Sequence, residues 1–256
     1  LCCETWSLRD YMKSGKYDPI TVMPLLKSLG IKGVSLNAVY LKSYERPYLD
    51  EVKRSAAENG IIIAALICDG DVVSDDEAAN KRQIQQYARQ MQAASYLGAP
   101  VVRLNIGGTG YPERDDSVGV ERAISAFNSL LPLARGFKVK MTIENHWGVT
   151  GKADNIVRIV KETDPEWVGT CPDFKNWHAD ALAQTAKVIP YAYHSHVKAH
   201  EFGPDGEEKG ADYPKVLRLF RDSGYTGAVS IEFEGSGDQI EGVRKTRDLI
   251  LKHWKL

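Results

Sequence analysis

The chain carries a segment of alternating polar and apolar residues near its C-terminal end, Tyr193-His194-Ser195-His196-Val197-Lys198-Ala199-His200. Successive side chains of a β-strand point to opposite faces, so residues two apart share a face. One face of this predicted strand therefore carries His194, His196, Lys198 and His200. A strand buried on both faces is normally apolar throughout. The polar face thus predicts a functional site in the interior of the fold.

The same pattern recurs in three other strand-length segments. The residues that share a face are Thr142, Glu144 and His146; Ser230, Glu232 and Glu234; and Arg103 with Asn105. In each segment the polar residues come late in the predicted strand. Barrel enzymes have their active sites at the carboxyl ends of the strands. We therefore expect these side chains to meet at that end of a barrel.

Outward from these segments, short apolar strands alternate with amphipathic helices. The predicted strands are residues 2–8, 33–39, 61–68, 101–106, 139–145, 167–171, 192–197 and 228–233. Eight units in 256 residues give 256/8 = 32 residues each, the length of one βα step in a barrel of roughly 250 residues.

Helix boundaries are marked by capping residues. Asp18 and Pro19 predict an N-cap and a first helical position, and Gly30 predicts the end of that helix. The run Ser74-Asp75-Asp76-Glu77 predicts a capping box, and Asp212 precedes another helix.

Strict alternation of strands and helices predicts parallel strands with right-handed crossovers. An open doubly wound sheet is the alternative, but no G-x-G-x-x-G follows the first strand. We therefore predict an α/β fold, a (β/α)8 TIM barrel. No linker or low-complexity segment divides the chain, so residues 1–256 are expected to form a single domain.

Composition excludes several classes of partner. The formal net charge is −1, from 33 basic and 34 acidic residues, whereas binding to nucleic acid usually needs a concentrated basic surface. No apolar run approaches the roughly 20 residues of a membrane span. We expect neither partner, and a cytoplasmic protein, with export left open because the chain begins at Leu1.

The four cysteines, Cys2, Cys3, Cys68 and Cys171, lack the C-x-x-C spacing of a zinc knuckle. We expect buried thiols in strands. His178 and His253 are expected on helices, at the surface.

Several carboxylates gathered at one barrel mouth would repel one another, at a cost of several kcal/mol each unless they are compensated. A self-satisfied hydrogen-bond network is one answer, and a divalent cation is the other. Two Glu, one Asp and one His offer three hard oxygens and one imidazole. That set suits manganese first, with Mg²⁺, Co²⁺ or Zn²⁺ as alternatives.

Four motifs occur in order along the second half of the chain. They are Thr142-Ile143-Glu144-Asn145-His146, Cys171-Pro172-Asp173-Phe174, His194-Ser195-His196-Val197-Lys198, and the closing stretch from Asp212-Tyr213-Pro214 through Gly224-Tyr225-Thr226-Gly227 to Ser230-Ile231-Glu232-Phe233-Glu234-Gly235. With these motifs the chain resembles the xylose isomerase-like barrel superfamily, in particular the sugar phosphate isomerase/epimerase group with tagatose and psicose 3-epimerases.

The resemblance implies a metal site of Glu144, Asp173, His196 and Glu232. It also implies that Glu144 and Glu232 are the catalytic acid/base pair. One glutamate removes a proton beside a carbonyl and the other returns it, through a metal-stabilised enediolate.

One position departs from the family pattern. Family epimerases often carry His three residues after the metal Asp, and this chain has Asn176 there. The departure bears on the substrate rather than on the metal. The residues predicted to bind substrate are Arg103, His146, Asn176, Lys198, His200 and Trp6. Trp6 and Trp147 could stack on a sugar ring, with core packing equally expected, and for Arg103 a structural salt bridge is equally expected.

The expected partner is a small-molecule sugar, with a homo-oligomer left open. Relatives that resemble endonuclease IV are disfavoured, because three zinc ions need more ligands than six His allow. Lyase, dehydratase or hydrolase chemistry on keto-sugars or cyclitols remains an alternative, as does a non-catalytic sugar-binding subunit. The Gly-rich segment 199–211 is expected to act as a lid over bound substrate.

Overall fold

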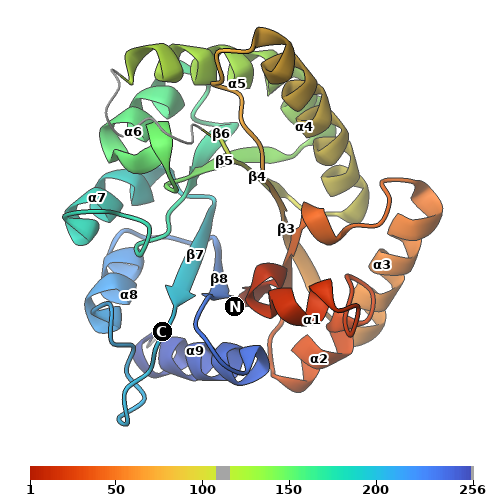
Figure 1. The fold of residues 1–256 in the computed structure, drawn as a ribbon, viewed down its shortest axis with the longest axis vertical. Coiled ribbons are helices and arrows are strands. Elements are labelled where there is room, and N and C mark those ends of the chain that lie inside the picture. The colour runs from red at the N-terminus through yellow and green to blue at the C-terminus, as the bar shows by residue number, and fades with distance from the viewer. Residues whose placement is uncertain (108–115, 255–256) are drawn as a thin grey trace.

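Eight parallel strands form one sheet in the computed structural model, which describes residues 1–107 and 116–254. They are β1 (Cys2–Glu4), β2 (Gly33–Asn37), β3 (Ile62–Cys68), β4 (Val101–Leu104), β5 (Lys140–Glu144), β6 (Val168–Cys171), β7 (His194–Ala199) and β8 (Ala228–Phe233). Their order is β6-β5-β4-β3-β2-β1-β8-β7. The helices surround the strands as an outer ring (Figure 1). The predicted (β/α)8 TIM barrel is confirmed.

The ring closes between β6 and β7, where only isolated bridges join the strands. Thr170 pairs with Ala192 and Asp173 with His196. Gly169 permits this approach, because a Cβ at that position would lie 2.4 Å from the carbonyl oxygen of Tyr191. The closure therefore places Asp173 and His196 side by side.

The described residues contain nine α-helices, one more than the eight predicted. They are α1 (Arg9–Lys13), α2 (Val22–Ser28), α3 (Arg46–Asn59), α4 (Glu77–Leu97), α5 (Ser117–Phe137), α6 (Ala153–Glu162), α7 (Ala181–Val188), α8 (Tyr213–Asp222) and α9 (Gln239–His253). The short α1 is the addition. The first two strands are also shorter than predicted, because 3-10 turns at Thr5–Leu8 and Ala38–Tyr40 end them.

Two predicted helix starts need correction. Asp18 does not cap α2, which begins at Val22; its carboxylate instead accepts the N–H groups of Ile20 and Thr21 at 3.0 and 2.9 Å, in a separate turn. The N-cap of α4 is Asp76 rather than Ser74.

Asp212 caps α8 as predicted, with its side chain accepting the N–H of Lys215. His178 lies in a loop rather than on a helix, and it is exposed. His253 ends α9 but is partly buried against Glu207.

The main core lies between the strands and the helices. Val197 and Ala199, on the apolar face of β7, are fully buried in it, as are Val216, Leu217 and Phe220 of α8. All four cysteines are free and buried, as predicted. No helix within the described ranges is long and apolar enough to cross a membrane. The outward faces of the strands thus carry the packing, and their inward faces are left for the site.

Candidate active site

The four predicted metal ligands lie at the carboxyl ends of β5 to β8. Glu144 is the last residue of β5 and Glu232 the penultimate residue of β8. His196 lies within β7, and Asp173 follows β6 by two residues. All four side chains are buried. Parallel strands end at the same rim, so four elements far apart in sequence deliver these groups to one place.

The distances within this group are short. His196 Nδ1 lies 3.1 Å from Glu144 Oε1 and 3.5 Å from Glu232 Oε2. One carboxylate oxygen from each of Glu144, Asp173 and Glu232 falls within 4.8 Å of the others. The structure thus brings the predicted set together, while its role as a metal site stays a prediction.

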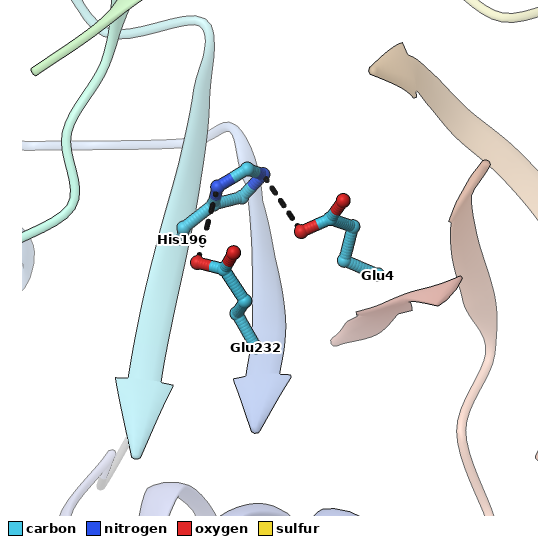
Figure 2. Close-up of side chains that lie close together, drawn as sticks. All are labelled: Glu4, His196 and Glu232. Carbon is cyan, nitrogen blue, oxygen red and sulfur yellow. Dashed lines mark ion pairs between the residues drawn. The ribbon is translucent and has the colours of Figure 1, made fainter. Parts of the chain in front are cut away.

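Glu4, at the end of β1, belongs to the same cluster and was missed in the sequence (Figure 2). It is buried, and its Oε2 lies 4.0 Å from His196 Nε2. Glu4, His196 and Glu232 form a second group whose ligand atoms lie within 4.8 Å of one another. The available signal was a glutamate in an otherwise apolar first strand. Our prediction ran that strand to residue 8, so Glu4 was placed mid-strand and not at the rim.

Lys198 supplies the cationic partner of the carboxylates. Its Nζ lies 3.1 Å from Asp173 Oδ2, 3.4 Å from Glu232 Oε2 and 3.0 Å from Glu234 Oε2. It also donates to Asn176 Oδ1 at 3.0 Å. Burial works against its charge, yet the surrounding carboxylates hold the pKa of Lys198 above its usual value. Lys198 is therefore a charged member of the cluster.

Arg103 enters from β4 and makes the second buried ion pair. Its Nε lies 3.1 Å from Glu144 Oε2, and one terminal nitrogen donates to Asp69 Oδ1 at 2.6 Å. Both predicted readings of Arg103 fit this position, because it borders the site and forms salt bridges.

The carboxyl groups differ in pKa because their neighbours differ. Burial raises the pKa of Asp173 to about 7 and that of Glu232 to about 8, although Lys198 acts against both shifts. Burial also acts to raise the pKa of Glu144, but His196 and Arg103 together hold it well below its ordinary value. Without a cation, Glu144 is ionised at neutral pH while Glu232 retains its proton.

His196 and His146 also differ in pKa. Burial disfavours a charged His196, yet Cys171, Glu144 and Glu232 beside it raise its pKa well above the ordinary value. Burial lowers the pKa of His146 to about 4, so this imidazole is neutral.

Several buried atoms of the cluster lack a hydrogen bond. They are Glu4 Oε2, Glu144 Oε2, Asp173 Oδ2, Glu232 Oε2, His196 Nε2 and Arg103 Nε. Buried polar atoms normally have a hydrogen-bond partner, because leaving one unpaired costs about 1–3 kcal/mol. Four of these atoms lie in ion pairs, Arg103 Nε with Glu144 Oε2 and Lys198 with Asp173 Oδ2 and Glu232 Oε2, so the self-satisfied network considered from sequence stays an alternative to a cation. Three such carboxylate oxygens beside an imidazole fit a divalent cation.

The other predicted substrate-binding residues surround this centre. Asn176 donates from Nδ2 to Glu144 Oε1 at 3.3 Å, and Trp6 donates from Nε1 to Glu234 Oε1 at 2.8 Å. His200 is 44% exposed and lies 3.7 Å from Glu234. These contacts place Asn176 deepest and His200 at the entrance.

His146 and Trp147 lie at the mouth after β5. Their ring centroids are 3.6 Å apart, and Trp147 is 38% exposed. Asn105 Nδ2 lies 3.3 Å from His146 Nδ1. Trp147 is therefore accessible for stacking.

The segment after β7 contacts neighbouring elements through charged side chains. Glu208 is buried, forms an ion pair with Lys175, and accepts the N–H groups of His200 and Gly210. At its tip Glu207 contacts His253 of α9 at 2.9 Å. Figure 1 shows the segment running outward beside the end of α9. The buried Lys175–Glu208 pair and the contact with α9 hold the segment in this conformation, and its expected role as a lid stays a prediction.

The xylose isomerase-like TIM barrel family matches residues 23–253, and the chain belongs to this family. A 69-residue segment is 32% identical to the C-glycoside deglycosidase alpha subunit of Arthrobacter globiformis. That match spans 27% of this chain and only 20% of the relative's length.

Solved structures share the fold at low identity. The apo 3-keto-D-glucoside 4-epimerase from E. coli has a TM-score of 0.78 at 17% identity, covering 92% of this chain and 94% of that one. D-psicose 3-epimerase from Clostridium cellulolyticum H10 has a TM-score of 0.76 at 16% identity, covering 100% and 99%. The IOLI protein with a bound zinc atom has a TM-score of 0.81 at 16% identity, covering 100% and 99%.

Proposed function

We propose that this protein is a metal-dependent carbohydrate epimerase or isomerase. Glu144, Asp173, His196 and Glu232 would hold one divalent cation, and Glu144 and Glu232 would transfer the proton. The observation that carries the proposal is the convergence of buried ligand side chains at the barrel mouth: oxygens of Glu144, Asp173 and Glu232 lie within 4.8 Å of one another, and His196 Nδ1 lies 3.1 Å from Glu144 and 3.5 Å from Glu232. The structurally similar epimerases and the zinc-containing neighbour support it.

The two glutamates are suited to opposite halves of a proton transfer. They lie on different strands, β5 and β8, so they would approach a bound sugar from different directions. As ligands of the cation both would be carboxylates, because binding displaces the proton that Glu232 holds in the metal-free protein. One glutamate would take the proton from the carbon beside a carbonyl, and the other would return a proton to that carbon or its neighbour. When bound, the cation polarises the substrate oxygens and stabilises negative charge.

We further propose that the sugar is uncharged rather than phosphorylated. Within the described residues, six carboxylates border the site: Glu4, Asp69, Glu144, Asp173, Glu232 and Glu234. They face Arg103 and Lys198, both already paired, and Arg9, which donates to the carbonyl oxygens of Phe233, Glu234 and Gly235 at the end of β8. A divalent cation offsets only part of this excess of negative charge. A phosphate dianion would be repelled, whereas hydroxyl groups can donate to the carboxylates.

Metal analysis followed by proton exchange tests the proposal. Purified protein is expected to retain or bind about one divalent cation, and EDTA is expected to abolish activity. The metal-loaded protein should exchange a carbon-bound proton of ketohexoses, pentoses or keto-glycosides in deuterated water, and act poorly on their phosphates. Absence of metal binding would reject the proposed site. A clear preference for phosphates would reject only the uncharged substrate.

The partial match to a deglycosidase subunit favours a second candidate, cleavage of a keto-glycoside by elimination with the same glutamate pair. Both reactions would begin with removal of a proton beside the carbonyl; in elimination a C=C bond would then form as the bond to the aglycone breaks, and the aglycone would leave with the electron pair and take up a proton. They differ in outcome, because cleavage releases an aglycone whereas epimerisation gives an isomer of unchanged mass. Mass spectrometry of a keto-glycoside reaction distinguishes the two.

A further inference from the structure

Glu4 and His196 present two unpaired buried atoms to each other. Glu4 Oε2 and His196 Nε2 both lack a hydrogen bond, and they lie 4.0 Å apart. Figure 2 shows the carboxylate on the side of the ring opposite Glu232. Both side chains are almost completely buried, at 1% and 0% exposed. Water is therefore not a ready substitute partner for either atom.

The other side of the imidazole faces the proposed cation centre. His196 Nδ1 lies 3.1 Å from Glu144 Oε1 and 3.5 Å from Glu232 Oε2. A neutral imidazole that ligates through Nδ1 must carry its proton on Nε2. That proton would point toward Glu4. The arrangement resembles the carboxylate–histidine–metal chains in which an outer carboxylate fixes the tautomer and orientation of the ligand.

Glu4 is itself held in one orientation. Asn37, at the end of β2, donates from Nδ2 to Glu4 Oε1 at 3.1 Å. The Asn37 side chain is fixed in turn, because its Oδ1 accepts the N–H of Val39 at 3.2 Å. Glu4 Oε1 is thus occupied, and Oε2 is left for His196.

We propose that Glu4 is a positioning residue that accepts the Nε2 proton of His196 and so keeps Nδ1 directed at the cation. The inference rests on the proposed metal site and extends it to β1, which pairs with β8. It also gives β1 and β2 a role in a site whose proposed ligands lie on β5, β7 and β8 and just after β6. A shift of about 1 Å in either side chain would bring the two atoms within hydrogen-bond distance.

Glu4→Gln is the most direct test. The amide oxygen would remain on Asn37, and the amide NH₂ would then face His196. Two donors would oppose each other, so the tautomer with a proton on Nε2 would be disfavoured. Loss of an outer-sphere partner of this kind typically weakens metal affinity about 10–100-fold. We expect the Kd for Mn²⁺, measured by calorimetry, to rise by that factor.

Two further variants separate positioning from general disturbance of the core. Cys171→Ala is the matched control, because this buried thiol also neighbours His196 but is a weak acceptor. It should leave the Kd for Mn²⁺ within about threefold of wild type, well below the effect expected for Glu4. Glu4→Asp keeps the charge and withdraws the carboxylate, so an intermediate rise is expected. This variant carries the test if Glu4→Gln does not fold.

Histidine ¹⁵N NMR of the Zn²⁺-loaded protein supplies a readout that a structural role would not move. In wild type the ring proton of His196 should reside on Nε2 in a hydrogen bond, and in Glu4→Gln that signal should be lost. A folded Glu4→Gln protein that binds Mn²⁺ with the wild-type Kd would overturn this inference and leave the proposed metal site intact. A His196 ring proton on Nδ1 in the wild-type protein would do the same. Failure of wild type to bind either metal overturns the proposed site as well.

Discussion

The inner surface of the barrel differs between β3–β4 and β5–β8. On the first side Ala65, Ile67 and Val101 form a small apolar cluster separate from the main core. At the rim of the second side lie the carboxylates and His196. The first side (the apolar side) holds apolar side chains and the second (the acidic side) concentrates charge, where burial raises the pKa values of Asp173 and Glu232.

Arg103 connects the two sides. It comes from β4, pairs with Ile67 in strand register, and reaches across to Glu144. The buried Arg103–Glu144 ion pair therefore links the two sides.

The largest expected effect comes from removing the proposed bases on the acidic side. Glu144→Gln and Glu232→Gln keep size and one ligand oxygen but remove the base. Loss of an acid/base group typically lowers the rate about 10²–10⁴-fold. Turnover should be measured at saturating metal, with bound metal determined alongside.

Asp173→Asn is the matched control for these two variants. It should act mainly through metal affinity, so excess Mn²⁺ should restore much of its activity. If metal-saturated Glu144→Gln and Glu232→Gln turned over at the wild-type rate, neither glutamate would be a catalytic base.

Breaking the Arg103–Glu144 ion pair should have the next largest effect, on the free energy of unfolding. Arg103→Met leaves the buried Glu144 carboxylate without its guanidinium partner, and removing one member of a buried ion pair costs about 3–5 kcal/mol. The free energy of unfolding of the metal-free protein, from urea titration, should fall accordingly. Added Mn²⁺ should recover part of the loss, since the cation replaces positive charge beside Glu144. An unchanged unfolding free energy would show that this pair is not stabilising.

A change of pH should have a smaller effect, on the association constant for Mn²⁺. The pKa values of Asp173 and Glu232, about 7 and about 8, mean that both are protonated at pH 6 in the metal-free protein. Ligation requires the carboxylates, so the cation must displace these protons. The association constant for Mn²⁺ should therefore rise with pH, by about tenfold per unit for each proton displaced.

The stability of the metal-free protein should change in the opposite direction. Both carboxyl groups have folded-state pKa values above their unfolded values, so the stability they contribute is present at low pH and lost as pH rises through 7 and 8. The metal-free protein should melt lower at pH 9 than at pH 6, and saturating Mn²⁺ should reduce the difference. A pH-independent Kd would contradict the assignment of these protons.

The smallest effect is expected on the apolar side. Ile67→Val removes one methyl group from a fully buried position and should cost about 0.5–1.5 kcal/mol of unfolding free energy. It should leave the Kd for Mn²⁺ unchanged, because Ile67 has no ligand atom. A large change in metal affinity would show that the packing of the apolar side controls the geometry of the acidic side.

Local sequence determined the eight strands, their parallel arrangement and the polar faces of β5, β7 and β8. Strand periodicity of two and helix caps act over a few residues, so they can be recognised without the fold. Asp212 was identified correctly for this reason. Asp18 was not, because a local side-chain turn and a helix N-cap use the same residues.

Only the three-dimensional arrangement decided which side chains from distant strands became neighbours, because this depends on the curvature of the barrel. Nothing near Glu4 in the sequence indicates that it lies beside His196, 192 residues away (196 − 4). β8 pairs with β1 on one side and with β7 on the other, and the curvature of the sheet across these three strands brings the two side chains together. The anchoring of segment 199–211 likewise depends on Lys175 and on α9. Residue types therefore determined the chemistry available to this protein, whereas closure of the sheet decided which of those groups share one buried, weakly screened space.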